Sequence, residues 1–105
     1  HAAAYMRFAV APGLRHRTIT QHGPYDLIMA NILAGPLRAL APGLCRQLLP
    51  WGDLILSGLL VRDVPGVLAA YRANGVTLNA LTEREGWVML HMKKGGKGSR
   101  PYRPF

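Results

Sequence analysis

Two uninterrupted apolar segments, residues 25–33 (YDLIMANIL) and 53–60 (DLILSGLL), restrict the folds open to this chain of 105 residues more than any other feature. Apolar runs of this length without alternation are typical of strands that are covered on both faces, as in parallel sheets. Between them, apolar residues recur at helical spacing over 36–49, and Pro42 interrupts that stripe. The pattern predicts a buried strand, then a kinked helix or two short helices, and then a second buried strand.

The second half of the chain continues this order. Asp63 is expected to cap a helix that ends at Gly75, because glycine adopts the left-handed conformation that often follows a last helical turn. Residues 76–82 and 87–92 alternate between apolar and polar side chains around a turn at 83–86, which predicts an antiparallel hairpin. The order strand, helix, strand, helix, hairpin predicts an α/β fold with an open, mostly parallel sheet and an antiparallel carboxyl-terminal hairpin.

Three further segments complete the prediction. Residues 1–11 (HAAAYMRFAVA) are rich in alanine, which favours the end of a helix that Pro12-Gly13 would stop. Residues 14–20 are expected to form a short strand. Pro50-Trp51-Gly52 is expected to turn the chain before the second apolar strand.

Positive charge is concentrated at the carboxyl terminus. The chain carries a formal net charge of +8, and residues 93–105 (KKGGKGSRPYRPF) hold five of the basic residues and no acid. The segments are therefore an amino-terminal helix and short strand over 1–24, an α/β part over 25–94 and a basic, flexible tail over 95–105. Two interpretations of the tail stay open, a solvated end or a weak contact with ribosomal RNA or another polyanion.

Several classes of protein are excluded by what the sequence lacks. Cys45 is the only cysteine, so no internal disulfide forms, and a reducing compartment such as the cytoplasm is expected. Its place beside the apolar stripe predicts a small buried side chain rather than a nucleophile. No apolar run reaches 18 residues, which argues against a membrane span. The four histidines lack the spacing of a metal site.

Asn31 is the one uncharged polar residue near the end of the first apolar strand. Ligands of open parallel sheets bind outside the carboxyl ends of the strands. The side-chain carbonyl of Asn31 and the backbone carbonyl of Ile32 would give two acceptors that hold the hydrogens of an uncharged amine and orient its lone pair. The alternative is that Asn31 only caps the turn before a helix at Pro36.

Two more residues are candidates for the same edge of the sheet. Ser57 ends the second apolar strand, so its hydroxyl is a secondary pocket candidate, and the alternative is a hydroxyl that bonds its own backbone. Trp87 begins the last strand. Core packing is the simplest interpretation of Trp87, and a place near the substrate is the other.

Several stretches, YDLIMANILAGPLRALAPGL, LLPWGDLILSGLL, VLAAYRANGV and EREGWVMLHM, resemble the carboxyl-terminal half of bacterial ribosomal-protein methyltransferases. That family uses S-adenosylmethionine to methylate amino groups of large-subunit ribosomal protein eleven. The resemblance implies a class I methyltransferase sheet, a ribosomal protein as substrate, and catalytic roles for Asn31 and Ile32 in orienting the amine. It also implies that Leu33 shapes the substrate pocket, beside the candidates Ser57 and Trp87.

The resemblance also implies features that this sequence lacks. The family's cofactor site uses a glycine-rich turn after its first strand and an acidic residue after its second, and the GGKG cluster at 95–98 follows no parallel strand and opens no helix. The chain begins at His1 without an initiating methionine, and the cofactor-binding residues are expected upstream of His1. We therefore expect a fragment of the enzyme that is inactive alone. The alternative is a non-catalytic α/β module that binds ribosomal components.

The missing first strand would leave the edge of residues 25–33 unpaired. Three solutions are expected: pairing with 14–20, association of two copies into a homodimer, or cover by a partner protein.

Overall fold

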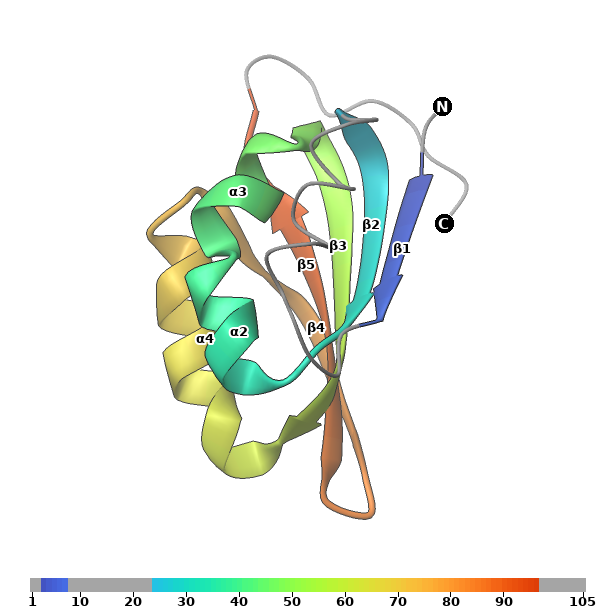
Figure 1. Ribbon diagram of the computed structural model, residues 1–105, viewed down its shortest axis with the longest axis vertical. Coiled ribbons are helices and arrows are strands. Elements are labelled where there is room, and N and C mark those ends of the chain that lie inside the picture. The colour runs from blue at the N-terminus through green and yellow to red at the C-terminus, as the bar shows by residue number, and fades with distance from the viewer. Residues whose placement is uncertain (1–2, 8–23, 97–105) are drawn as a thin grey trace.

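The computed structural model describes residues 24–96 in full and the backbone of 3–7 (Figure 1). A single sheet contains five strands in the order β1-β2-β3-β5-β4. The strands are β1 (Ala3–Arg7), β2 (Tyr25–Asn31), β3 (Leu48–Leu60), β4 (Val76–Arg84) and β5 (Trp87–Lys94). The helices are α2 (Ala34–Ala39), α3 (Ala41–Arg46), the 3-10 turn η1 (Val61–Asp63) and α4 (Val64–Arg72).

The direction of the strands confirms the α/β class and the hairpin, but not a mostly parallel pairing. β2 pairs in parallel with both β1 and β3. β5 lies between β3 and β4 and is antiparallel to both, so half of the pairings are antiparallel. Sequence order alone does not reveal this, because the final strand inserts between two strands that run in the opposite direction to it.

The helices α2, α3 and α4 all cover the same face of the sheet (Figure 1). The core lies between them and the strands, and its largest fully buried side chains include Ile28, Leu37, Leu44, Leu54, Leu56, Tyr71, Leu90 and Met92. The Tyr71 hydroxyl donates a 2.8 Å hydrogen bond to the Leu37 carbonyl, which ties α4 to α2 inside this core. None of the described helices is long and apolar enough to cross a membrane.

The region around Pro42 confirms the prediction of two short helices. α2 and α3 meet at Leu40, and Pro42 occupies the first turn of α3, where the absent N–H costs no hydrogen bond. The second helix ends at Arg46, earlier than the predicted 49. Lys94 helps to fix this end, because its Nζ donates to the carbonyls of Cys45 and Leu48 at 2.7 and 2.8 Å.

The expected turn at Pro50-Trp51-Gly52 is wrong, because β3 runs through it. Trp51 takes a positive φ of 65°, and the register with β2 shifts between Tyr25 and Leu27. The chain therefore continues as one long strand that is irregular around Trp51. The Trp51 indole is packed so closely against Gly96 that a Cβ added to Gly96 would lie 2.7 Å from the indole Nε1.

The helix expected near the amino terminus is also wrong for the described part. Residues 3–7 form β1, which pairs with β2 from Ala3 opposite Leu27 to Arg7 opposite Asn31. The backbone hydrogen bonds that the β2 edge offers outweigh the weak helical preference of alanine. This edge is therefore paired within the chain by β1, and neither a second copy nor a partner is needed there.

Several predictions fall on residues that the structure does not describe. His1 and Ala2, residues 14–20 and the tail from 97 all lie outside the described residues. The short strand at 14–20, the basic tail and the place of the cofactor site upstream of His1 therefore stay predictions.

The helix at 64–72 is confirmed, with one difference at its start. Asp63 is the N-cap residue, yet its carboxylate bonds backwards and accepts a 3.0 Å hydrogen bond from the Leu60 N–H. Gly75 follows the helix with a φ of 81°, as expected for a residue beyond a last turn.

Candidate functional site

The carboxyl end of β2 carries the residue that the sequence singles out. Asn31 is the last residue of β2, is half-buried, and lies opposite Ser57 of β3 in the parallel register. Parallel strands end at the same edge of a sheet, so the ends of β1, β2 and β3 meet here, on the side where the β4–β5 hairpin turns (Figure 1). This is the edge at which open α/β sheets bind ligands.

Gly58 sets the surroundings of the Asn31 amide. Its φ of 82° is one that side-chain-bearing residues rarely adopt, and a Cβ at this position would overlap the Asn31 side-chain oxygen. β3 is irregular at this point, since its register with β5 shifts between Leu56 and Leu59. Among the described residues, none is hydrogen-bonded to the Asn31 side chain. Within the part of the chain that the structure describes, the amide is therefore held by packing, and no hydrogen bond occupies its acceptor.

The two residues after Asn31 have different environments. The Ile32 side chain is 1% exposed and belongs to the core, so only its backbone can face the edge. The Leu33 side chain is 59% exposed, and its carbonyl accepts a 2.9 Å hydrogen bond from the Leu37 N–H that starts α2. Leu33 thus offers an apolar surface beside Asn31 while its backbone is fixed by the helix.

An open hollow of about 390 Å³ adjoins this edge. Its lining residues come from β3, β4 and β5, and they are Ser57, Gly58, Thr82, Arg84, Trp87, Val88 and Met89. The structure therefore brings Ser57 and Trp87 together, and Gly58 connects the hollow to the Asn31 amide. Ile32 and Leu33 are not part of its lining.

Trp87 does not belong to the core. Its side chain is 57% exposed, and it begins β5 opposite Arg84, the last residue of β4. The same register places Thr82 opposite Met89, which is 44% exposed. The sequence did not lead us to predict that Arg84, Thr82 and Met89 line the hollow. The alternation within the predicted hairpin was a signal that could have found them.

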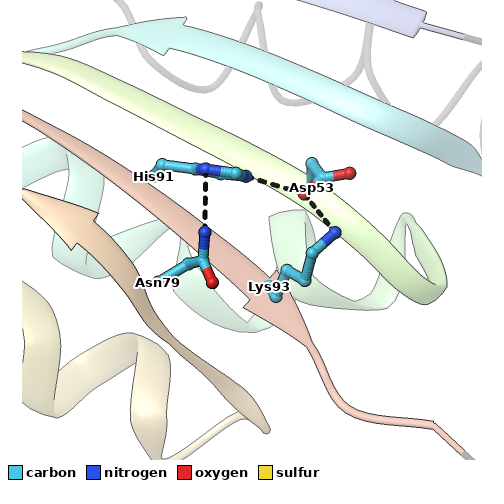
Figure 2. Close-up of polar contacts among 4 residues, drawn as sticks. All are labelled: Asp53, Asn79, His91 and Lys93. Atoms are coloured by element: carbon cyan, nitrogen blue, oxygen red, sulfur yellow. Dashed lines mark hydrogen bonds and ion pairs between the residues drawn. The ribbon is translucent and has the colours of Figure 1, made fainter. Parts of the chain in front are cut away.

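A second polar cluster lies on the same sheet but away from this edge (Figure 2). The buried Asp53 carboxylate accepts from Lys93 Nζ at 2.5 Å and contacts His91 Nε2 at 2.7 Å. The other ring nitrogen of His91 is 3.2 Å from Asn79 Nδ2. Asp53 precedes Ser57 by four residues, or about 13 Å of strand. Lys93 offsets the charge of the Asp53 carboxylate, and both ring nitrogens of His91 contact side chains of the cluster. We therefore interpret this cluster as structural.

Comparison with known proteins decides the family. The family model described as ribosomal protein L11 methyltransferase (PrmA) matches residues 4–95. The chain belongs to this family. An L11 methyltransferase of Chelativorans sp. (strain BNC1) is 45% identical over 89% of this chain and 32% of that protein. One of Brucella suis (strain ATCC 23445 / NCTC 10510) is 45% identical over 87% of this chain and 32% of that protein. The chain thus spans about a third of the length of these relatives.

Solved structures agree with the family. The crystal structure of a ribosomal protein L11 methylase from Lactobacillus delbrueckii subsp. bulgaricus superimposes with a TM-score of 0.66 and 31% identity, covering 70% of this chain and 38% of that one. The M1.HpyAVI–SAM complex, at 13% identity and a TM-score of 0.64, covers 88% of this chain and 55% of that one and supports the fold alone. The chain therefore has the class I methyltransferase fold.

The glycine cluster of the sequence does not fit the cofactor that this family implies. Gly95 and Gly96 belong to the glycine cluster of the sequence, and both are used in packing. Gly95 donates to the Gly75 carbonyl at 3.0 Å, and Gly96 lies against the Trp51 indole. A cofactor loop needs free backbone N–H groups in front of a helix. Gly95 and Gly96 therefore form no such cradle, and a cofactor site upstream of His1 remains the prediction from the sequence.

Cys45 is a buried thiol of the core. Its side chain is 2% exposed, as predicted, and burial raises the pKa of the thiol to about 11. A thiol with so high a pKa is a poor nucleophile at neutral pH. No group of three or more possible metal ligands occurs among the residues that the structure describes.

Proposed function

We propose that this chain is the amine-binding part of an S-adenosylmethionine-dependent methyltransferase that modifies an amino group of a ribosomal protein. The observation that carries the proposal is the Asn31 amide, which lies at the ligand-binding edge of the sheet beside Gly58 and has no hydrogen-bond partner among the described residues. The family and the names of the relatives support the substrate class.

The proposed role of the site is to bind and orient the amine in its uncharged form. Oδ1 of Asn31 and the carbonyl of Ile32 accept two N–H bonds, which leaves the nitrogen lone pair free to attack a methyl group. A protonated amine has no lone pair, so its extra proton must first pass to water. Among the described residues that line the hollow beside Asn31 none is acidic, so none of them stabilises the charged amine.

Three neighbours complete the proposed pocket. The exposed Leu33 side chain would contact the carbon chain that carries the amine. Ser57, the register partner of Asn31, would offer its hydroxyl to the substrate backbone. Trp87 would supply a flat apolar wall on the far side of the hollow. Since the glycine cluster does not fit the cofactor, the role proposed for this chain is confined to the amine that accepts the methyl group.

The proposal is tested by titrating the isotope-labelled chain with a short acetylated, amidated peptide that contains one lysine. We expect shifts of the Asn31, Ser57 and Trp87 resonances that grow from pH 7 to pH 10, because the free lysine pKa is about 10.4. A peptide with norleucine in place of lysine is the ligand control. Asn31→Ala should remove the preference for lysine, whereas the matched variant Asn79→Ala, on the exposed strand β4, should keep it.

Equal binding of the lysine and norleucine peptides, or an unchanged preference in Asn31→Ala, would overturn the proposal. Binding to a ribosomal RNA fragment without any lysine preference would favour the non-catalytic module instead.

A further inference from the structure

Arg84 is the charged residue of the hollow, and it has no counterion among the described residues. The ion pairs found in that part of the chain both involve Asp53. The acidic neighbours of Arg84 do not compensate it, because Glu83 lies opposite Val88, on the other face of the strand, and Glu85 occupies the turn with a φ of 53°. An exposed cation thus borders a largely apolar hollow.

The chemistry of the lining defines the ligand that it fits. One guanidinium, the hydroxyls of Ser57 and Thr82, and the apolar surfaces of Trp87 and Met89 face the same space, with no acid among them. Arginine binds carboxylates in a planar, two-pronged arrangement. A complementary ligand therefore has an apolar body and carries a carboxylate.

We propose that the hollow binds an acidic residue of the substrate polypeptide close in sequence to the amine held at Asn31, with Arg84 as the residue that selects it. This inference rests on the proposed function and adds a rule for the sequence around the target. β2 and β4 are separated by β3 and β5, so Asn31 and Arg84 lie about 14 Å apart at the usual strand spacing. An extended peptide covers that distance in about four residues.

The test uses two peptides with one central lysine, acetyl-Gly-Glu-Ala-Ala-Ala-Lys-Ala-Ala-Ala-Glu-Gly-amide and the same peptide with both Glu replaced by Gln. Because a glutamate lies on each side of the lysine, the peptide can present one to Arg84 whichever way its chain runs. Each is titrated into the labelled chain at low salt, with the Trp87 indole resonance as the readout. We expect about two- to fivefold tighter binding of the Glu peptide, the size of an exposed ion pair, and loss of the difference at high salt.

Three variants test whether Arg84 causes the preference for the Glu peptide. Arg84→Gln should bind both peptides equally, Arg84→Lys should keep part of the preference, and Arg72→Gln, which removes an exposed arginine at the end of α4, should keep all of it. Equal binding of both peptides to the unaltered chain, no binding of either, or a preference that survives in Arg84→Gln would overturn the inference.

Norleucine versions of both peptides separate this inference from the proposed function. A preference for Glu over Gln that persists with norleucine confirms the role of Arg84 even if lysine proves irrelevant. A preference for lysine without one for Glu supports the proposed function and contradicts the role of Arg84.

Discussion

The backbone of Gly58 lies directly against the side-chain oxygen of Asn31, so that a Cβ at position 58 would overlap this oxygen. The contact crosses from β3 to β2 at the edge where both strands end. A glycine at position 58 therefore does two things at once. It permits a positive φ, and it leaves room for the amide that the proposed chemistry requires.

Gly58→Ala should destabilise the chain and disturb the lysine site. We expect about 1–2 kcal/mol of lost stability from the positive φ and roughly 1 kcal/mol more from the overlap with Asn31. Gly75→Ala is the matched control, because Gly75 has a φ of 81° and nothing within 4 Å of an added Cβ. Urea unfolding and the lysine peptide titration measure both effects. Equal loss in the two variants, with lysine preference intact, would contradict the contact.

Asp53→Asn should cost about 2–4 kcal/mol of folding stability. The substitution removes a buried carboxylate and leaves Lys93, whose side chain is 12% exposed, without its counterion. Asn79→Ala, which removes the outermost member of the same cluster, should change stability by less than about 0.5 kcal/mol. Both are measured by urea unfolding. A small effect of Asp53→Asn would show that the pair contributes little to the fold.

Tyr71→Phe should lower stability by about 1–2 kcal/mol. The variant removes the buried hydroxyl that donates to the Leu37 carbonyl and keeps the ring in the core. The expected signature is a lower urea midpoint with an unchanged dependence of the unfolding free energy on urea. An unchanged midpoint would mean that water replaces this hydrogen bond without loss.

Cys45 should make the chain less stable in alkali. Burial, partly offset by Lys94, raises the pKa of the thiol from 9.0 to about 11. Between these values the unfolded chain loses the thiol proton and the folded chain keeps it, so stability falls with rising pH by about 3 kcal/mol in total.

Cys45→Ala should abolish the part of the alkaline loss of folding stability that the thiol causes. Burial also raises the pKa of Tyr71, which adds its own loss above pH 10 in both proteins, so the difference between the two pH profiles isolates the thiol. Parallel profiles from pH 8 to pH 11 would contradict the assignment.

Local patterns predicted those parts of the fold that local rules determine. Pro42 divided the helical stripe, Gly75 ended α4, and the alternation around 83–86 identified the hairpin. Pairing between distant segments overrode such rules elsewhere. The alanines at the start of the chain favour a helix, yet the edge of β2 recruits residues 3–7 as a strand. Trp51 has a positive φ inside β3, which no propensity of tryptophan indicates.

The candidate site shows the same division. Asn31 and Ser57 could be named because the sequence places them near the ends of two apolar segments, whereas their register pairing is seen only in the structure. The contact between Gly58 and Asn31 could not be found, because it depends on an irregularity of β3 that has no sequence signal. Arg84 was overlooked because a charged residue near a hairpin turn is ordinarily solvated, and only the hollow gives it a context.

The most direct test of the central claim is the intermolecular nuclear Overhauser effect between a bound lysine peptide and the labelled chain. We expect contacts from the lysine ε-methylene protons to the Asn31 side-chain amide, and from the same lysine to Leu33 or the Trp87 ring. Contacts confined to any other surface, or unchanged contacts of the lysine with Leu33 or Trp87 in the Asn31→Ala variant, would contradict it.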